Sequence, residues 1–373
     1  MTIDSKKYTV YLKYLEIGII AALIFFLCIT YGGINYETND DTAMNLIAAG
    51  AYGEPSQYLV YSGILWGYFI KLLYSIFPSV NCYLLTFLFL NLVSVISICV
   101  VLSEKLDLAW TAVVTVLVNV FCFKDFYVDI QYSKNAEIYA IVGTVLVISA
   151  IGKLNRYWGR LLAGAIFLDL GTAVRKEGAI QVAPLALVTL IFVFGQQFFI
   201  VKDEEIIEDT KNLSVTFVRD SLRKLVVPVV ACLIVLATNF VAYDLNQDWK
   251  DYYQWDKIMV QKRDFGNYNF EWFQDEYLAN GFTEWDFRLM ENWMWNDCDN
   301  YSLDKIKLMA EIGKGIKMNR FRFDTKLVGD TAGLIGEAAK LSMLPVMFLV
   351  TLITSVFIGI RRQNWGGVQQ ELC

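Results

Sequence analysis

Histidine is absent from this 373-residue chain. Its absence removes the commonest transition-metal ligand and the usual proton shuttle near neutral pH, so acid–base chemistry would fall to carboxylates, lysines and tyrosines. The seven cysteines include no CxxC pair and lie mostly in or beside apolar runs, which indicates neither a disulfide framework nor a cysteine metal site. A basic stripe with interleaved aromatic residues is also missing, which argues against nucleic-acid binding.

Apolar residues, by contrast, make up 56% of the chain and give it a mean hydropathy of +0.43. They are gathered in runs of roughly 17–23 residues, the length that a helix needs to cross a bilayer. This pattern predicts an all-α polytopic membrane protein. We expect eight spans, at residues 15–34, 81–102, 108–123, 136–151, 160–174, 178–200, 225–243 and 342–360.

The segment 58–77 decides the topology, because a span here would invert the side of every later loop. It contains Lys71, two glycines and four tyrosines, which suits a helix lying in the outer membrane interface. If it does not cross, the basic residues concentrate on the cytoplasmic side, as the positive-inside rule requires. We therefore expect a multi-pass protein of the plasma membrane with both termini in the cytoplasm.

This topology divides the chain into three parts. Residues 1–243 form a transmembrane domain, with a first outer loop at 35–57, the interfacial helix at 58–77 and a cytoplasmic linker at 201–224 whose mixed charge is typical of a solvated loop. Residues 244–340 form an outer cap, and residues 341–373 hold the last membrane helix and a cytoplasmic tail. We expect the tryptophan-rich cap to be mainly helical, with one apolar stripe formed by Leu303, Ile306, Lys307 and Ala310.

Three carboxylates, those of Glu37, Asp40 and Asp41, directly follow the first span. They have a local interpretation, in which a polar residue of this stretch caps a helix that starts near Thr42. They also have a catalytic interpretation, in which one carboxylate is the general base that deprotonates an acceptor hydroxyl, or Asp40 and Asp41 bind Mg²⁺ or Mn²⁺. Two adjacent acids allow one to cap while the other reacts.

Two further charged groups lie on the same expected membrane face. Asp125 and Asp129 stand in the loop 124–137, where their charges either balance nearby lysines or join the first acidic stretch in one site. Arg175 and Lys176 form a basic pair at an outer helix end, against the positive-inside trend. That pair is either held by Glu177 within its own loop or serves to bind an anion.

This arrangement resembles the GT-C superfamily of membrane glycosyltransferases. The likeness rests on an outer acidic motif after the first span, an interfacial helix, a second acidic outer loop and basic residues at later outer ends. The run from Asn39 through Asp41 to Tyr61 and Pro78 also resembles uncharacterised Firmicutes-type membrane proteins associated with surface-polysaccharide synthesis.

The resemblance implies a role for each candidate residue. It matches Asp40 or Asp41 to the acid of the first outer loop, Asp125 or Asp129 to that of the second, and Arg175 to the cation that faces the donor phosphate. Glu37 belongs to the implied catalytic group, and Lys176 and Tyr61 to the implied substrate-binding group.

The function expected from this likeness is transfer of a sugar from a polyprenyl-phosphate-linked donor to a glycan or lipid-linked acceptor at the outer face, in cell-envelope glycan assembly. A transporter or flippase of lipid-linked saccharide is a rival, which would be expected to bury charged residues at mid-span and often to have repeated halves. A non-catalytic membrane partner of such a system is a third interpretation.

The expected topology can be tested with cysteines placed singly at Ser214 and Ser302 in a background that lacks the native cysteines. Because residues 201–224 are expected inside and 244–340 outside, an impermeant maleimide added to intact cells should label position 302 and not position 214. Labelling of position 214 and not of position 302 would show that the true topology is the reverse of the expected one.

Overall fold

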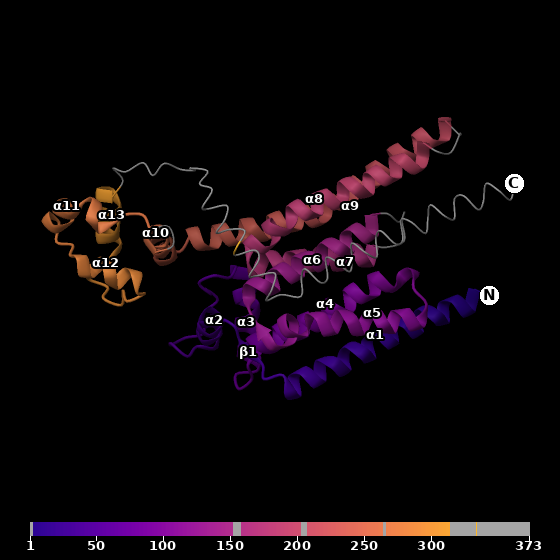
Figure 1. Ribbon diagram of the computed structural model, residues 1–373, viewed down its shortest axis with the longest axis horizontal. Coiled ribbons are helices and arrows are strands. Elements are labelled where there is room, and N and C mark those ends of the chain that lie inside the picture. The colour runs from indigo at the N-terminus through magenta and orange to yellow at the C-terminus, as the bar shows by residue number, and fades with distance from the viewer. Residues whose placement is uncertain (1–2, 152–157, 203–206, 264–265, 314–332, 334–373) are drawn as a thin grey trace. The chain divides into compact units, whose positions relative to one another are not determined.

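The computed structural model describes residues 3–151, 158–202, 207–263, 266–313 and 333 (Figure 1). The chain forms two compact units, Met1–Lys250 and Asp251–Cys373, and the division falls inside one helix, α10 (Gln247–Arg263). The cap was expected to begin at residue 244, so the second unit starts slightly later than the sequence pattern suggested.

The first unit is built almost entirely from helices. Its two short strands and nine α-helices are, among the described residues, α1 (Ile3–Tyr31), β1 (Asn35–Tyr36), α2 (Asn39–Ala49), α3 (Ile64–Ile76), α4 (Cys82–Leu102), α5 (Leu108–Phe123), β2 (Asp129–Ile130), α6 (Tyr132–Ile151), α7 (Trp158–Val174), α8 (Lys176–Lys202) and α9 (Ile207–Asp244). A 3₁₀ turn, Ser103–Lys105, follows α4, and a π-helical turn, Lys124–Val128, follows α5.

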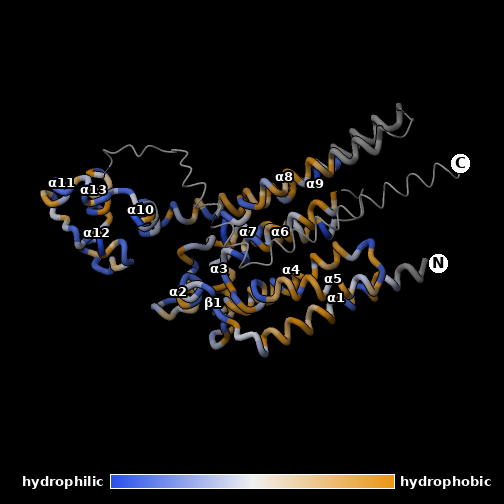
Figure 2. Tube along the Cα trace, in the orientation of Figure 1, coloured by the Kyte–Doolittle hydropathy of each residue, from blue (hydrophilic) through white to orange (hydrophobic). Residues whose placement is uncertain are grey.

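Six helical stretches of the described chain are long and apolar enough to cross a membrane: Tyr8–Tyr31, Cys82–Lys105, Leu108–Val128, Tyr132–Ile151, Lys176–Phe194 and Arg219–Asp244. Figure 2 shows apolar residues along the long helices of this unit. The chain is therefore an all-α membrane protein, as its composition predicted. Of the other two expected spans, 160–174 corresponds to the 17-residue α7, and 342–360 lies outside the described residues.

Helix α3 is too short to span. Its 13 residues extend about 20 Å at 1.5 Å per residue, against a hydrocarbon thickness of about 30 Å. One face packs Trp66, Ile70 and Tyr74 into the core, while the exposed residues are mostly apolar: Leu65, Tyr68, Phe69, Leu72 and Ile76. This combination is typical of a helix lying in the membrane interface.

Glycines let α7 and α8 approach the beginning of α6 closely. A methyl group added at Gly171 of α7 would lie 2.7 Å from the carbonyl oxygen of Ala136 in α6. One added at Gly178 of α8 would lie 3.0 Å from the Ala136 carbonyl carbon and Cβ. The first turns of α6 and α8 and the last turn of α7 are therefore in contact, and Arg175 lies in this corner.

The segment 201–224 differs from the expected solvated loop, because α9 begins at Ile207 and continues without interruption to Asp244. Residues 207–224 contain neither proline nor glycine, which are the residues that most strongly disfavour a helix. Lys224 and Asp220, one turn apart on α9, form an ion pair of 2.9 Å that adds to helix stability.

The second unit is a small helical body with its own core. After α10 come a 3₁₀ turn (Phe270–Trp272), α11 (Gln274–Ala279), α12 (Glu284–Glu291) and α13 (Leu303–Gly313). The core is centred on Tyr277, which is fully buried and donates a hydrogen bond to the carbonyl of Met309 (3.2 Å). The part of the expected cap that the structure describes, residues 251–313, is mainly helical, and residues 314–332 and 334–340 lie outside the described chain.

The stripe expected on α13 is only partly correct. Ile306 and Ala310 are buried, but Met309 and Gly313 complete the buried face in place of Leu303 and Lys307, which are half-exposed. A helical face that includes positions 306, 309, 310 and 313 follows the i, i+3, i+4, i+7 spacing.

Candidate functional site

The two acidic loops meet through a pair of very short parallel strands. Asn35 of β1 pairs with Asp129 of β2, and Tyr36 pairs with Ile130. The Glu37 amide extends the contact by donating a hydrogen bond to the Ile130 carbonyl (3.0 Å). The loop after α1 and the loop after α5 therefore converge, as the sequence suggested they might.

Asp41 stands at the centre of this junction. The residue is fully buried, yet its carboxylate accepts three hydrogen bonds: from the Thr38 hydroxyl (2.8 Å), the Tyr83 hydroxyl (3.0 Å) and the Tyr132 backbone amide (2.9 Å). Tyr83 belongs to α4 and Tyr132 is the first residue of α6. One carboxylate thus joins three helices and satisfies an amide at the start of α6, which no backbone carbonyl of that helix can reach.

Burial raises the pKa of the Asp41 carboxyl to about 6, because an ionised carboxylate loses hydration there. The three hydrogen bonds oppose the rise, and the neighbouring charge of Asp40 adds to it. Asp40 itself is only half-buried, in the first turn of α2. The adjacent acids therefore differ in environment, one enclosed by protein and the other partly open to solvent.

The first acidic stretch does not cap α2 in the expected manner. Thr38 occupies the N-cap position, but its hydroxyl donates to Asp41 and makes no hydrogen bond to the helix backbone. The helix starts earlier than expected, at Asn39, and ends at Gly50, whose φ of 80° is the left-handed conformation that glycine favours.

Arg175 contacts the same residue, Tyr132, at its side chain. Its Nη1 donates to the Tyr132 hydroxyl (3.3 Å) and to the Ser133 hydroxyl, and its guanidinium carbon lies 5.2 Å from the centre of the Tyr132 ring. Tyr61 stacks on that ring at 6.3 Å. Tyr132 therefore connects the acidic corner, through its amide, with the cationic corner, through its ring.

The ion pair expected within the basic loop is present but loose. The Nε atom of Arg175 lies 3.5 Å from the Glu177 carboxylate, and the Nζ atom of Lys176 lies 3.8 Å from it. Lys176 is exposed, whereas Arg175 is half-exposed and held by Tyr132 and Ser133. Of the two basic residues, Arg175 is the one fixed in the convergence of loops.

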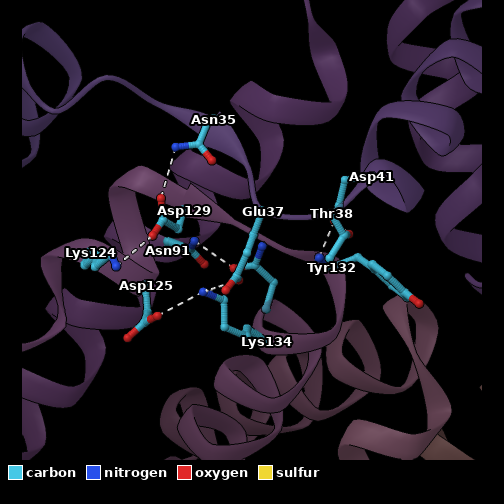
Figure 3. Close-up of polar contacts among 11 residues, drawn as sticks. Asn35, Glu37, Thr38, Asp41, Asn91, Lys124, Asp125, Asp129, Tyr132 and Lys134 are labelled. Carbon is cyan, nitrogen blue, oxygen red and sulfur yellow. Dashed lines mark hydrogen bonds and ion pairs between the residues drawn. The ribbon is translucent and has the colours of Figure 1, made fainter. Parts of the chain in front are cut away.

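The remaining candidate acids carry lysine partners (Figure 3). Lys134 pairs with both Glu37 (2.6 Å) and Asp125 (2.9 Å), and Asp129 pairs with Lys124 (3.3 Å). Asp129 also accepts a hydrogen bond from the Asn35 side chain (3.0 Å). These contacts tie the loops together, and each is the kind of partly exposed ion pair that contributes about 0–1 kcal/mol.

No group of three or more cysteine, aspartate or glutamate side chains in the described residues is arranged to hold a metal ion. Asp41 has both carboxylate oxygens occupied by hydrogen bonds, so it fits a Mg²⁺ or Mn²⁺ ligand poorly. Asp40 is partly exposed, and a metal ion bound there would need substrate or water oxygens to complete its coordination shell.

Sequence reasoning missed Tyr132 and Tyr83, which hold Asp41 and Arg175 in place. Tyr132 stood within the recognised loop 124–137, and its position directly before an apolar run was the available signal. Tyr83 lies at the beginning of an expected span and resembles an ordinary interfacial tyrosine, so its contact with Asp41 had no local signature. Comparisons of the chain with protein-family models, with curated proteins and with solved structures find no match.

The raised pKa of Asp41 predicts how stability depends on pH. Because the native pKa of about 6 exceeds the usual value near 3.8, protonation favours the folded state. That contribution is complete below about pH 4 and is lost as the pH rises through 6; two pKa units correspond to at most about 3 kcal/mol. In Asp41→Asn, the side-chain amide oxygen can accept the hydrogen bonds from the Tyr83 hydroxyl and the Tyr132 amide, and the side chain does not titrate. The Tm of the wild type should therefore fall between pH 4 and 7 relative to that of Asp41→Asn.

Thr38→Val serves as the matched control, because it keeps the carboxylate and removes a hydrogen bond that favours its charged form. Its Tm should fall with pH at least as steeply as that of the wild type. Parallel Tm curves for the wild type and Asp41→Asn from pH 4 to 8 would show that Asp41 does not titrate in this range.

Proposed function

We propose that the protein is a membrane glycosyltransferase that moves a sugar from a polyprenyl-phosphate-linked donor to an acceptor hydroxyl, in cell-envelope glycan assembly at the outer face of the plasma membrane. The observation that carries the proposal is that Tyr132 contacts both charged groups: its amide donates to Asp41, and its hydroxyl and ring contact Arg175. The acidic stretch that contains Asp40 and Asp41 and a cationic group are thereby joined through one residue of the helical bundle.

The cationic side suits a lipid phosphate. Arg175 precedes α8, and its partners Tyr132 and Ser133 open α6, so the positive ends of two helix dipoles lie close to its guanidinium. The contact of Gly178 with Ala136 keeps those helix ends together. A guanidinium offers a phosphate a charge-assisted, two-pronged contact, which strengthens as the leaving phosphate gains charge.

The acidic side suits the acceptor. In the proposed reaction, the acceptor oxygen attacks the anomeric carbon, the bond from that carbon to the phosphate oxygen breaks, and the hydroxyl proton passes to Asp40. Asp40 takes this role because it is partly exposed, whereas Asp41 is enclosed by its three donors. Asp41 then acts as a positioning residue that fixes α2 against α4 and α6.

A flippase or transporter of lipid-linked saccharide is favoured by buried acids within the helices. Asp169 in α7 and Glu16 in α1 each have a buried carboxylate oxygen, Oδ1 and Oε2 respectively, with no hydrogen-bond partner among the described residues. Two such acids on different helices, one of them beside the Thr172–Cys232 contact of 3.7 Å between α7 and α9, do not by themselves form a pathway. The converged outer corner contains more of the unusual chemistry, and the transferase is therefore our choice.

Mutations of Asp40 and Asp41 should have different effects, because Asp40 is proposed to react and Asp41 to hold the fold. Asp40→Asn is expected to lower glycan formation by roughly 10²–10⁴-fold, the usual contribution of a general base, with an unchanged Tm. Glycan product would be measured in cells whose only copy carries the variant, and Tm on the purified protein. Asn39→Ala, the preceding residue of the same helical turn, is the control and should retain product. If Asp40→Asn also retains most product, Asp40 is not the base.

Arg175 should be required for donor binding. Arg175→Ala is expected to weaken binding of undecaprenyl phosphate and to lower turnover strongly, and Arg175→Lys to restore only part of each, because lysine keeps the charge but loses the planar fork. Arg160→Ala is the control, because Arg160 sits at the other end of α7 in an ion pair with Glu104 (2.5 Å). Unchanged donor binding in Arg175→Ala, with a lower Tm in Glu177→Ala, would reduce the group to a structural ion pair.

A further inference from the structure

The second unit exposes a cluster of large apolar side chains around the end of α12, which we name the tryptophan face: Trp285, Leu289, Trp293 and Met294. Trp285 is 68% exposed and Trp293 is 60% exposed. Leu289 lies one turn after Trp285 on α12, and the Met294 amide donates to the Leu289 carbonyl (2.9 Å), so the segment that follows the helix stays next to its last turn. Exposed tryptophans grouped in this way mark a binding surface more often than chance exposure does.

Each exposed indole has an arginine placed against it. The guanidinium carbon of Arg263 lies 4.1 Å from the centre of the Trp293 ring, and that of Arg288 lies 5.3 Å from the centre of the Trp285 ring. Cation–π contacts of this kind restrict the orientation of a ring that would otherwise move in solvent. The rings are therefore held in place while much of their surface stays accessible.

The backbone at Trp293 shows that this side chain occupies an unfavourable position. Helix α12 ends with the Trp293 amide bonded to the Met290 carbonyl (3.2 Å) and the Met294 amide bonded to the Leu289 carbonyl, a Schellman arrangement. Trp293 fills the position of that motif where glycine is preferred, with a φ of +62°. Helix termination alone would favour glycine at this position, so the presence of tryptophan calls for an explanation other than helix termination.

Charge distinguishes between the possible occupants of the tryptophan face. Residues 251–313 contain thirteen acidic residues against six basic ones, so an anionic lipid surface would be repelled. Insertion into the headgroup layer would also carry along the Arg288–Glu284 ion pair (2.5 Å) and the exposed Glu291, at a cost in hydration. A neutral saccharide meets neither penalty. Its C–H face packs on an indole, and its hydroxyls find carboxylate, amide and guanidinium partners at the rim.

We propose that the tryptophan face binds a saccharide, with sugar rings stacked on Trp293 and Trp285, and that this saccharide is the glycan acceptor. The second half of the assignment rests on the proposed transferase function, whereas binding itself does not. Saccharide binding is measured without turnover. A failure of the transferase proposal therefore leaves the binding proposal testable, and a failure of binding leaves the transferase proposal testable.

The experiment uses the full chain in detergent micelles on an array of immobilised neutral oligosaccharides, followed by titration with the soluble form of any sugar retained. Trp293→Gly should weaken binding about tenfold or more, while its Tm stays equal to or above that of the wild type, because glycine suits the left-handed position. Trp285→Ala should weaken binding similarly. Trp272→Ala, an exposed tryptophan outside the face, should bind as the wild type does.

Two results would overturn the proposal. One is an array on which no saccharide is retained, or is retained equally by the wild type and Trp293→Gly. The other is a lower Tm in Trp293→Gly with unaltered binding, which would assign the indole to the fold. A membrane role is tested in nanodiscs of brominated phosphatidylcholine: quenching of tryptophan fluorescence that disappears in Trp285→Phe and Trp293→Phe, but not in Trp272→Phe, would show that the face docks on lipid instead.

Discussion

The buried carboxylate of Asp41 is the interaction that joins α2, α4 and α6 at the end of the first unit where β1 and β2 pair. A carboxylate without water is costly unless hydrogen bonds replace its hydration, and Asp41 receives one from its own helix turn, one from α4 and one from α6. Those donors have different sequence separations, 3, 42 and 91 residues. A single group therefore fixes segments that the chain brings together only in the folded state. The strand pair β1–β2 and the ion pairs of Lys134 lie beside it and add smaller contributions.

The two neighbouring acids illustrate how one short motif serves two purposes. Asp41 is enclosed and its carboxyl titrates near pH 6, so its charge state is linked to the integrity of the junction. Asp40 follows the same backbone turn but points into a less enclosed setting. Because residues adjacent on a helix project about 100° apart, one can face the core while the other faces a ligand. The proposed reaction needs this separation, because Asp41 is fully buried with both carboxylate oxygens hydrogen-bonded and therefore cannot reach an acceptor hydroxyl.

The sequence predicted the membrane class because apolar run length is a local property. Helices α4, α5 and α6 follow the expected runs within four residues, whereas α1 begins at Ile3, well before the expected start at residue 15. Helix α3 was also legible, since Lys71 and its tyrosines distinguish it from a span. The linker 201–224 was misread as a loop, because mixed charge was given more weight than the absence of helix-breaking residues. In the site, the candidate residues were visible as charges out of place. Their partners Tyr83 and Tyr132 were not, because those contacts depend on helix packing that no single stretch of sequence encodes.

The packing that positions Arg175 is of this non-local kind. Its guanidinium is placed by the meeting of α6, α7 and α8, and that meeting requires Gly171 and Gly178, where any side chain would press on the backbone of α6. Tyr132 links the position of Arg175 to that of Asp41, because its amide donates to the Asp41 carboxylate and its ring is covered by the Arg175 guanidinium. A displacement of α6 would therefore move Arg175 and Asp41 together. This coupling keeps the guanidinium and the acidic stretch in a constant arrangement, which the proposed transfer between a bound phosphate and a bound hydroxyl requires.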